Sequence, residues 1–350
     1  MFYFPLLRTK KGEINALANL SPGARDVINP ILQVPPPDMA RDGIPTAPSS
    51  AFVHKMAENV QPVLVTGSSL PCFLDPSPAG LSSTLLEELL TAIASYGGTP
   101  QPVFELAGSG DYARLYARII GRPRTAIIRL GLNQMGASIA VQVATALALY
   151  GLSADQTLLL LDMGDISTPG LPLNLYEAAF IGAISSLSAL SLGGIIVASC
   201  ALPSSTPTLV NWRSTQFVRH ELTVFRNIKS ATGQSLHFGD YAVGNVITGP
   251  SPSRQGSPKV RYTGATEYEV MKGQKTGTPP NTMSEQYNRL SLHLVGHHSY
   301  QGPAFSWGDD YIHKASQPGS PTTKRGNPAV WVSIHTSHHL ELVASMLPSM

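Results

Sequence analysis

The sequence predicts an α/β protein built as a (β/α)8 barrel of the TIM-barrel type, with additions at its C-terminal end. Strand-like and helix-like segments alternate from the N-terminus at a spacing of about thirty residues. Eight strand-like segments occur up to residue 241. The sixth, at 157–161, is almost all leucine, which is typical of a parallel strand buried on both faces.

An open doubly wound α/β sheet is the alternative fold. Its dinucleotide-binding form begins with a G-x-G-x-x-G turn after the first strand, and residues 8–13 are basic instead. The closed barrel is therefore favoured.

The strands are predicted from short apolar runs that end in polar or turn-forming residues. Three prolines, Pro35 to Pro37, stop the second strand, and a Gly239-Asp240 corner ends the eighth. The predicted strands are 2–7, 27–34, 62–66, 102–106, 125–130, 157–161, 194–200 and 236–241.

The helices are predicted from apolar residues at helical spacing and from capping residues. Thr84 and Glu87 have the spacing of a capping box, and Gly97 and Gly98 end that helix. The predicted helices are 12–19, 50–58, 84–97, 112–120, 137–150, 175–190 and 212–229.

The pattern changes after residue 241. The segments predicted there are a mobile Gly/Pro/Ser-rich loop at 246–258, a hairpin of strands 259–263 and 267–272, a helix at 284–297 as the eighth barrel helix, a polar linker at 317–327 and a histidine-containing apolar segment at 331–346. We expect the barrel region 1–241 and the C-terminal region 242–350 to pack together as one domain.

Composition limits the possible functions. The 350 residues are 43% hydrophobic and 13% charged, which is enough apolar sequence for a large core. A net charge of +2 argues against nucleic acid as the partner. The apolar start 1–7 is too short for a signal peptide, and the apolar stretch 178–200 is interrupted by Gly193 and Gly194. We expect a cytoplasmic protein with no membrane partner.

The two cysteines, Cys72 and Cys200, form neither a disulfide framework nor a metal-binding pattern. Buried thiols are favoured over a nucleophilic role.

Polar residues at the predicted strand ends form the candidate site, because the C-terminal strand ends of a barrel meet at one rim. These residues are Arg8, Gln33, Glu105, Arg129, Asp162 and Asp240. The three carboxylates are expected to act as catalytic acid and base or to hold a divalent metal through oxygen. A structural alternative is that they form ion pairs within the mouth, such as Arg129 with Asp162.

Basic residues near the same rim are expected to bind an anion, with phosphate the most natural choice. Arg8, Arg129 and Arg261 are the principal candidates, with Tyr241 and Lys11 beside them. A solvated basic surface is the alternative for Lys11 and Arg261.

His335 and His339 are weak candidates for zinc ligands, because residues four apart share one face of a helix. The motif that would strengthen this interpretation has a glutamate between the histidines, and none is present. Packing or hydrogen bonding is therefore favoured. Trp307 to Asp310 is interpreted as a turn, with a lid or metal loop as the functional alternative.

The C-terminal third resembles the family known as "beta protein", which occurs in bacteria and their phages. The resemblance lies in Phe238 to Tyr241, Arg261 to Thr263, Gly302 to Phe305 with Trp307 to Asp309, Gly326-Asn327, Trp331 and His338-His339, and in the opening Tyr3 to Pro5 with Gly12-Glu13. Family members usually carry arginine where this chain has Val332, and often an acidic residue where it has Gln33. The resemblance implies a microbial or phage setting and no established activity.

Two hypotheses from different classes follow. The first is a phosphodiesterase-like hydrolase that acts on a phosphorylated small molecule or nucleotide, in which Asp240→Asn should abolish turnover without unfolding the protein. The second is a non-catalytic module that binds a protein partner in phage–host conflict or defence. It predicts paired rim carboxylates and an exposed aromatic patch around Tyr300, Phe305 and Trp307.

Overall fold

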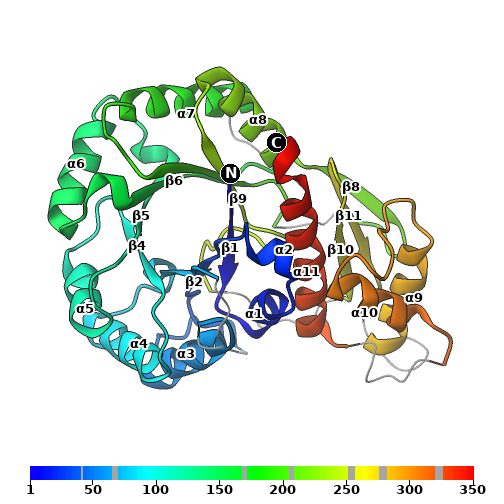
Figure 1. Cartoon of the computed structure of the whole chain (residues 1–350). Coiled ribbons are helices and arrows are strands. Elements are labelled where there is room, and N and C mark those ends of the chain that lie inside the picture. Colours follow the sequence, from blue (N-terminus) through cyan, green and yellow to red (C-terminus); the bar gives the residue numbers. More distant parts are fainter. Residues whose placement is uncertain are drawn as a thin grey trace.

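The computed structural model describes residues 1–40, 42–64, 70–167, 172–204, 209–250, 257–275, 282–319 and 326–350. They form a closed barrel of parallel strands surrounded by helices, with a three-stranded antiparallel sheet beside it (Figure 1). The barrel strands are β1 (Tyr3–Arg8), β2 (Ile31–Gln33), β3 (Phe73–Asp75), β4 (Gln101–Glu105), β5 (Ala126–Gly131), β6 (Thr157–Asp165), β7 (Gly194–Cys200) and β9 (Leu236–Asp240). Pairing of β1 with β9 closes the barrel, which confirms the predicted fold class.

The third strand was predicted in the wrong place. Residues 62–64 belong to the end of helix α3 (Ser50–Leu64), residues 65 and 66 lie outside the described part of the chain, and the strand is β3. A short run of valine and leucine suits a strand or the end of a buried helix equally well. The buried positions Val53, Met56, Val60 and Val63 continue the helical spacing through Pro62.

The remaining helices flank the barrel and the second sheet. They are α1 (Lys11–Ala18), α2 (Pro22–Arg25), α4 (Ser83–Ser95), α5 (Asp111–Ile119), α6 (Ile139–Tyr150), α7 (Leu173–Leu187), α8 (His220–Thr232), α9 (Met283–Val295), α10 (Trp307–Ser316) and α11 (Pro328–Met346). None of the helices in the described residues is long and apolar enough to cross a bilayer.

The helix that packs beside the first strand is α11, not the predicted segment 284–297. It packs against α1, α2 and β1 on one side and against β10 and α10 on the other (Figure 1). Helices α11 and α10 approach each other closely at Gly308. A Cβ added at this glycine would lie 2.2 Å from the backbone oxygen of Ile334. The segment expected to be the eighth barrel helix is α9, which packs on α10 and β10 instead.

The second sheet has the order β10–β11–β8. Strands β10 (Lys259–Thr263) and β11 (Glu267–Lys272) form the predicted hairpin with the predicted bounds. Strand β8 (Ser214–Val218) was predicted as the start of a helix, and the helix α8 begins only at His220. The chain therefore leaves the barrel after β7, adds an edge strand to the outer sheet and returns through α8.

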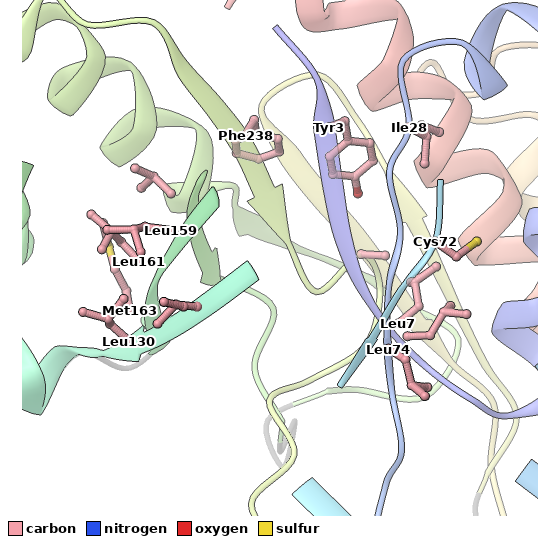
Figure 2. Close-up of a cluster of buried hydrophobic side chains, with 14 of the residues drawn as sticks. Tyr3, Leu7, Ile28, Cys72, Leu74, Leu130, Leu159, Leu161, Met163 and Phe238 are labelled. Atoms are coloured by element: carbon pink, nitrogen blue, oxygen red, sulfur yellow. The ribbon is translucent and has the colours of Figure 1, made fainter. Parts of the chain in front are cut away.

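Side chains of the barrel strands alternate between an inner and an outer core. The inner core includes Phe4, Leu6, Ile31, Phe73, Val103, Ile127, Leu160, Ile196 and Tyr241. Outward-facing residues pack under the helices; Figure 2 shows Tyr3, Leu7, Leu74, Leu159, Leu161 and Phe238 among them. A third core, centred on Trp331, joins β10 with α9, α10 and α11.

Candidate functional site

The C-terminal ends of the strands form a polar mouth above the inner core. The strand register places Arg8, Gln33 and Asp75 side by side and pairs Glu105 with Arg129. Asp162 and Tyr241 occupy the same inner face, two residues beyond Leu160 and Gly239 respectively. Most of the residues predicted from strand ends therefore do meet, as the barrel geometry requires.

Arg129 organises one side of the mouth. Its Nη1 lies 2.9 Å from Asp75 Oδ2, and its Nη2 lies 2.6 Å from Asp162 Oδ2 and 3.1 Å from the Tyr241 hydroxyl. Tyr241 in turn donates to Asp162 Oδ2 at 2.6 Å. Burial lowers the pKa of Arg129, but Asp162, Tyr241 and Asp75 raise it by more, so the guanidinium stays charged.

The contacts of Arg129 differ from its predicted role as an anion-binding residue and match the alternative, an ion pair within the mouth. Arg129 was expected to bind an external anion, but all three of its nitrogens already bond to the chain's own side chains. The ion pair with Asp162 is the structural alternative considered from the sequence. Asp75 was missed, because it lies between the predicted strand 62–66 and the predicted helix 84–97.

Glu105 differs from the other carboxylates of the mouth. Its side chain is exposed, and within the described residues its carboxylate makes no hydrogen bond or ion pair. The surrounding protein raises the pKa of Glu105 by desolvation, the negative charge of Asp75 raises it further, and Arg129 opposes both effects. Glu105 is thus the carboxylate of the mouth that is available to a ligand.

Glu105 lines a polar cavity of about 370 Å³. The other residues lining it are Gln33, Ser77, Pro78, Ala107, Arg129, Gly131, Gln134, Asp162 and Ile247. Gln33 is only 2% exposed and donates from Nε2 to Asp75 Oδ2 at 3.1 Å. Its amide oxygen accepts no hydrogen bond from the described residues.

A second cavity of about 270 Å³ lies between the barrel mouth, β10 and α11. Three cationic side chains line it: Arg8 from β1, and Lys259 and Arg261 from β10. Arg8 donates to the backbone oxygen of Asn245 at 3.2 Å, and Arg261 donates to that of Val243 at 2.6 Å. No carboxylate forms an ion pair with either guanidinium among the described residues.

This concentration of positive charge affects the pKa values of the cationic side chains that line the cavity. Burial lowers the pKa of Arg261, and the neighbouring Arg8 lowers it further. Burial, Arg261 and Lys272 likewise lower the pKa of Lys259. Glu13 is the one carboxylate among the described residues that line the cavity, and burial raises its pKa. The cavity therefore holds a surplus of positive charge that a bound anion would offset.

The two cavities are neighbours. Gln33 lines both of them. Tyr241 lines the basic cavity, and its hydroxyl bonds to Asp162, which lines the polar one. The mouth thus has two adjoining cavities, and we call the basic one and the carboxylate-rich one its two halves.

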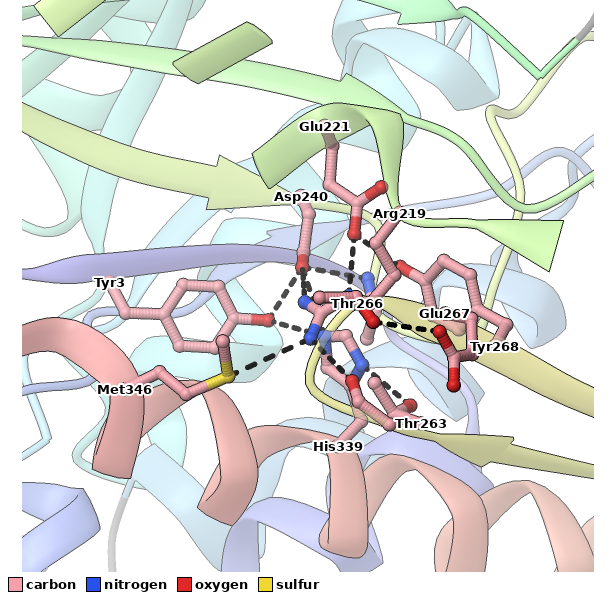
Figure 3. Close-up of polar contacts among 12 residues, drawn as sticks. Tyr3, Arg219, Glu221, Asp240, Thr263, Thr266, Glu267, Tyr268, His339 and Met346 are labelled. Carbon is pink, nitrogen blue, oxygen red and sulfur yellow. Dashed lines mark hydrogen bonds and ion pairs between the residues drawn. The ribbon is translucent and has the colours of Figure 1, made fainter. Parts of the chain in front are cut away.

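Asp240 does not belong to this mouth, which corrects its predicted position. It is the last residue of β9, and its side chain points to the outer face, where it is 1% exposed. Its oxygens bond to the Tyr3 hydroxyl at 2.5 Å and to His339 Nε2 at 2.9 Å, as Figure 3 shows. Because strand side chains alternate, Tyr241 occupies the inner position that Asp240 was expected to hold.

A second ion pair extends the buried cluster around Asp240. Arg219 Nε lies 2.8 Å from Glu221 Oε1, which also accepts from the Tyr268 hydroxyl at 2.9 Å (Figure 3). Burial raises the pKa of Asp240, but His339, Arg219 and Tyr3 together hold it below its ordinary value. The cluster connects β1 and β9 of the barrel to β11, α8 and α11.

The histidines of α11 have structural partners. His335 accepts from the backbone N–H of Arg261 at 3.4 Å and lines the basic cavity, whereas His339 bonds to Asp240 and Thr263. His338 lies between Asp309 and the backbone oxygen of Thr263, at 2.8 Å from each. Among the described residues, no group of three or more His, Cys, Asp or Glu side chains is placed to hold a metal ion. Hydrogen bonding was the favoured interpretation.

Other predicted residues lie elsewhere. Lys11 lines a separate groove between α1 and α3 with Lys10 and Lys55, so it does not join the basic cavity. Trp307 to Asp310 form the first turn of α10, not a loop. Cys72 and Cys200 are buried free thiols, as expected, and burial raises the pKa of each to about 12.

The aromatic patch expected of an interaction module is not exposed. Tyr300, Phe305 and Trp307 are half-buried; Tyr300 and Trp307 pack against the core around Trp331, and Phe305 against His338. Lys259 and Glu13 were missed as members of the basic cavity, because neither lies at the end of a barrel strand.

Two solved structures resemble this chain distantly. A glucosidase from Croceicoccus marinus is 16% identical, with a TM-score of 0.34 over 50% of this chain and 43% of that one. A GH138 enzyme that targets the pectin rhamnogalacturonan II is 7% identical, with a TM-score of 0.39 over 90% of this chain. The match again spans 43% of that enzyme. Both scores are too low to support a statement about activity, and no curated protein matches the sequence significantly.

The family comparison covers nearly the whole chain. The model of the family described as "Beta protein" matches residues 3–345. The match includes every barrel strand, the outer sheet and most of α11. Gln33 and Val332, the two positions at which the sequence analysis expects departures from the family pattern, both line the basic cavity. The chain belongs to the beta protein family.

Proposed function

We propose that the barrel mouth binds a phosphorylated small molecule or nucleotide, with its phosphate in the cavity lined by Arg8, Lys259 and Arg261. The observation that carries this proposal is the convergence of three cations on one cavity that has a single carboxylate among its described lining residues. Structural arginines in a folded protein are ordinarily paired with carboxylates, as Arg129 and Arg219 are here.

Phosphate suits this cavity for two reasons. Arg8 and Arg261 are held by backbone oxygens through one nitrogen each, which leaves further N–H groups for a bidentate contact with phosphate oxygens. A bound dianion would also offset the mutual repulsion that lowers the pKa of Arg261 and Lys259. Binding should therefore depend strongly on charge and weaken as salt rises.

Metal-assisted phosphoester hydrolysis has less support than binding. The expected carboxylate triad is divided, because Asp240 lies on the outer face and Asp162 is engaged by Arg129 and Tyr241. Glu105 is the remaining carboxylate available for acid–base chemistry. A protein-binding role has no exposed aromatic patch at the predicted place to support it.

The test is a titration of the whole protein with inorganic phosphate by calorimetry, repeated with Arg261→Gln. We expect saturable binding by the wild type, and at least a tenfold loss in Arg261→Gln because a charge-assisted contact is removed. Sulfate serves as a second oxyanion, and chloride as the control for general ionic strength.

The matched control is Arg124→Gln. Arg124 is exposed and precedes β5, so it lies at the opposite end of the barrel from the mouth. The variant makes the same change in charge and should bind phosphate as the wild type does. Equal losses in the two variants would show general electrostatic attraction and would refute a specific phosphate site.

A further inference from the structure

We propose that the polar cavity around Glu105 is a second subsite for the same ligand, one that accepts hydroxyl or ammonium groups and rejects a second anion. This inference rests on the proposed phosphate site. It narrows the ligand to a phosphate monoester whose other end carries hydrogen-bond donors, as a sugar phosphate or an amino sugar phosphate does.

Two open acceptors in this cavity point to a donor-bearing ligand. The Glu105 carboxylate is exposed there and has no partner among the described residues. The amide oxygen of Gln33 is also without a donor in the described chain, although the residue is only 2% exposed. Both residues line the cavity, where a ligand hydroxyl would donate to these acceptors in place of water.

Most of the side-chain donors around this cavity are already used; the exception is the Nε2 of Gln134, whose Oε1 accepts from the backbone N–H of Gly131. Arg129 directs its nitrogens to Asp75, Asp162 and Tyr241. Gln33 Nε2 donates to Asp75, and the Tyr241 hydroxyl donates to Asp162. An anionic group in this cavity would therefore meet more acceptors and negative charge than free donors, because the amide of Gln134 is neutral.

The half around Glu105 has an excess of negative charge, whereas the basic half has an excess of positive charge. The carboxylates of Glu105, Asp75 and Asp162 face a single cation, Arg129, on this side of the mouth. Desolvation and Asp75 raise the pKa of Glu105, which indicates that a further negative charge is unfavourable here. The basic cavity has three cations and one carboxylate.

One molecule would occupy both halves by extending past Gln33, where the two cavities adjoin. Gln33 lines both cavities, with its donor side used by Asp75 and its acceptor side open. A ligand with its phosphate near Arg8 and Arg261 would place its adjoining hydroxyls beside Gln33. The next groups along that ligand would then reach Glu105.

The test uses two matched pairs of phosphate esters, titrated into the wild type by calorimetry with inorganic phosphate as reference. Sorbitol 6-phosphate and 6-phosphogluconate are linear and differ by a hydroxyl or a carboxylate at the far end. Glucose 6-phosphate and glucosamine 6-phosphate differ by a hydroxyl or an ammonium group. We expect 6-phosphogluconate to bind at least tenfold more weakly than sorbitol 6-phosphate. Glucosamine 6-phosphate should bind at least as tightly as glucose 6-phosphate.

Glu105→Gln tests the residue itself, because the amide keeps the shape and removes the charge. The penalty on 6-phosphogluconate should shrink several-fold in this variant, while the affinity for inorganic phosphate stays the same. Glu87→Gln is the control, because Glu87 forms a surface ion pair with Arg118 on α4 and α5. It should leave the ligand preferences unchanged.

The outcomes separate the subsite from the phosphate site. If inorganic phosphate binds in an Arg261-dependent manner but 6-phosphogluconate binds as well as sorbitol 6-phosphate, the second subsite is wrong and the phosphate site stands. If neither phosphate nor any ester binds, both proposals are wrong. The ligand pairs are compared in the wild type, so the preference between them is measured independently of how the variants fold.

Discussion

Asp240 and Tyr241 are neighbours in sequence, yet they belong to two different polar regions. Tyr241 faces the inside of the barrel, where its hydroxyl joins Arg129 and Asp162 beside an open cavity. Asp240 faces outward, where Tyr3 and His339 seal it from solvent. Both regions contain carboxylates, an arginine and a tyrosine, so composition alone does not distinguish them.

The difference lies in which groups each region leaves open to a cavity. In the outer cluster, His339, Tyr3 and the backbone N–H of Ala242 already occupy the Asp240 carboxylate. In the mouth, Glu105 and the two arginines of the basic cavity have bonding capacity to spare. A polar cluster sealed from solvent holds elements together, whereas one left open at a cavity can bind a ligand.

The largest expected effect comes from breaking the outer cluster. Asp240→Asn leaves Arg219 and His339 buried beside a neutral amide, and we expect a loss of about 3–5 kcal/mol of unfolding free energy. Urea denaturation measures it, with the exposed Asp155→Asn as control. A fully stable variant that had lost only ligand binding would place Asp240 in the functional site after all.

Breaking the network inside the mouth should cost less. Arg129→Gln leaves Asp75 and Asp162 without their cation, but the arginine side chain is 20% exposed, so water can replace part of the interaction. We expect a loss of about 1–3 kcal/mol in the same denaturation experiment. A loss larger than that of Asp240→Asn would reverse the ranking of the two regions.

His335 should make stability depend on pH. Burial, Arg261 and His338 depress its pKa well below 6.5, so the unfolded chain gains a proton near pH 6.5 that the folded protein resists. Stability should therefore fall as pH decreases below 6.5, by about 1.4 kcal/mol per pH unit from this group, until its folded pKa is reached. His335→Gln should lose this slope, and the difference between the two denaturation curves isolates it. Parallel curves for the two proteins would contradict the assignment.

Glu105→Gln should change stability least. The carboxylate is exposed and bonds to nothing in the described chain, so we expect the unfolding free energy to change by no more than about 0.5 kcal/mol. Thermal unfolding is a sufficient measurement. A loss of about 2 kcal/mol or more, on the scale of a buried hydrogen bond, would show that Glu105 has a structural partner.

Sequence patterns located most of the barrel, because alternation of apolar strands and helices leaves a strong signal. They located the hairpin of β10 and β11 to the residue, since its turn is bounded by two runs of strand-forming residues. They missed β3, which has three residues, and the edge strand β8, whose partner β11 lies much later in the chain.

The site was predicted in part for a similar reason. Arg8, Glu105, Arg129 and Asp162 follow directly from the rule that strand ends meet at one rim. The predicted position of Asp240 was wrong because a shift of one residue along a strand moves a side chain to the opposite face. An apolar run does not show which face its last residue occupies. The cations of β10 reach the mouth only through tertiary packing of the outer sheet.

The position of Tyr3 has a consequence for the order in which the chain folds. Its hydroxyl bonds to Asp240 and His339, which follow it by 237 and 336 positions. During synthesis, β1 leaves the ribosome long before β9 and α11, so the partners of the Tyr3 hydroxyl do not yet exist. Because such distant contacts form slowly, closure of the barrel should be a late event, and the early strands need protection from aggregation until then.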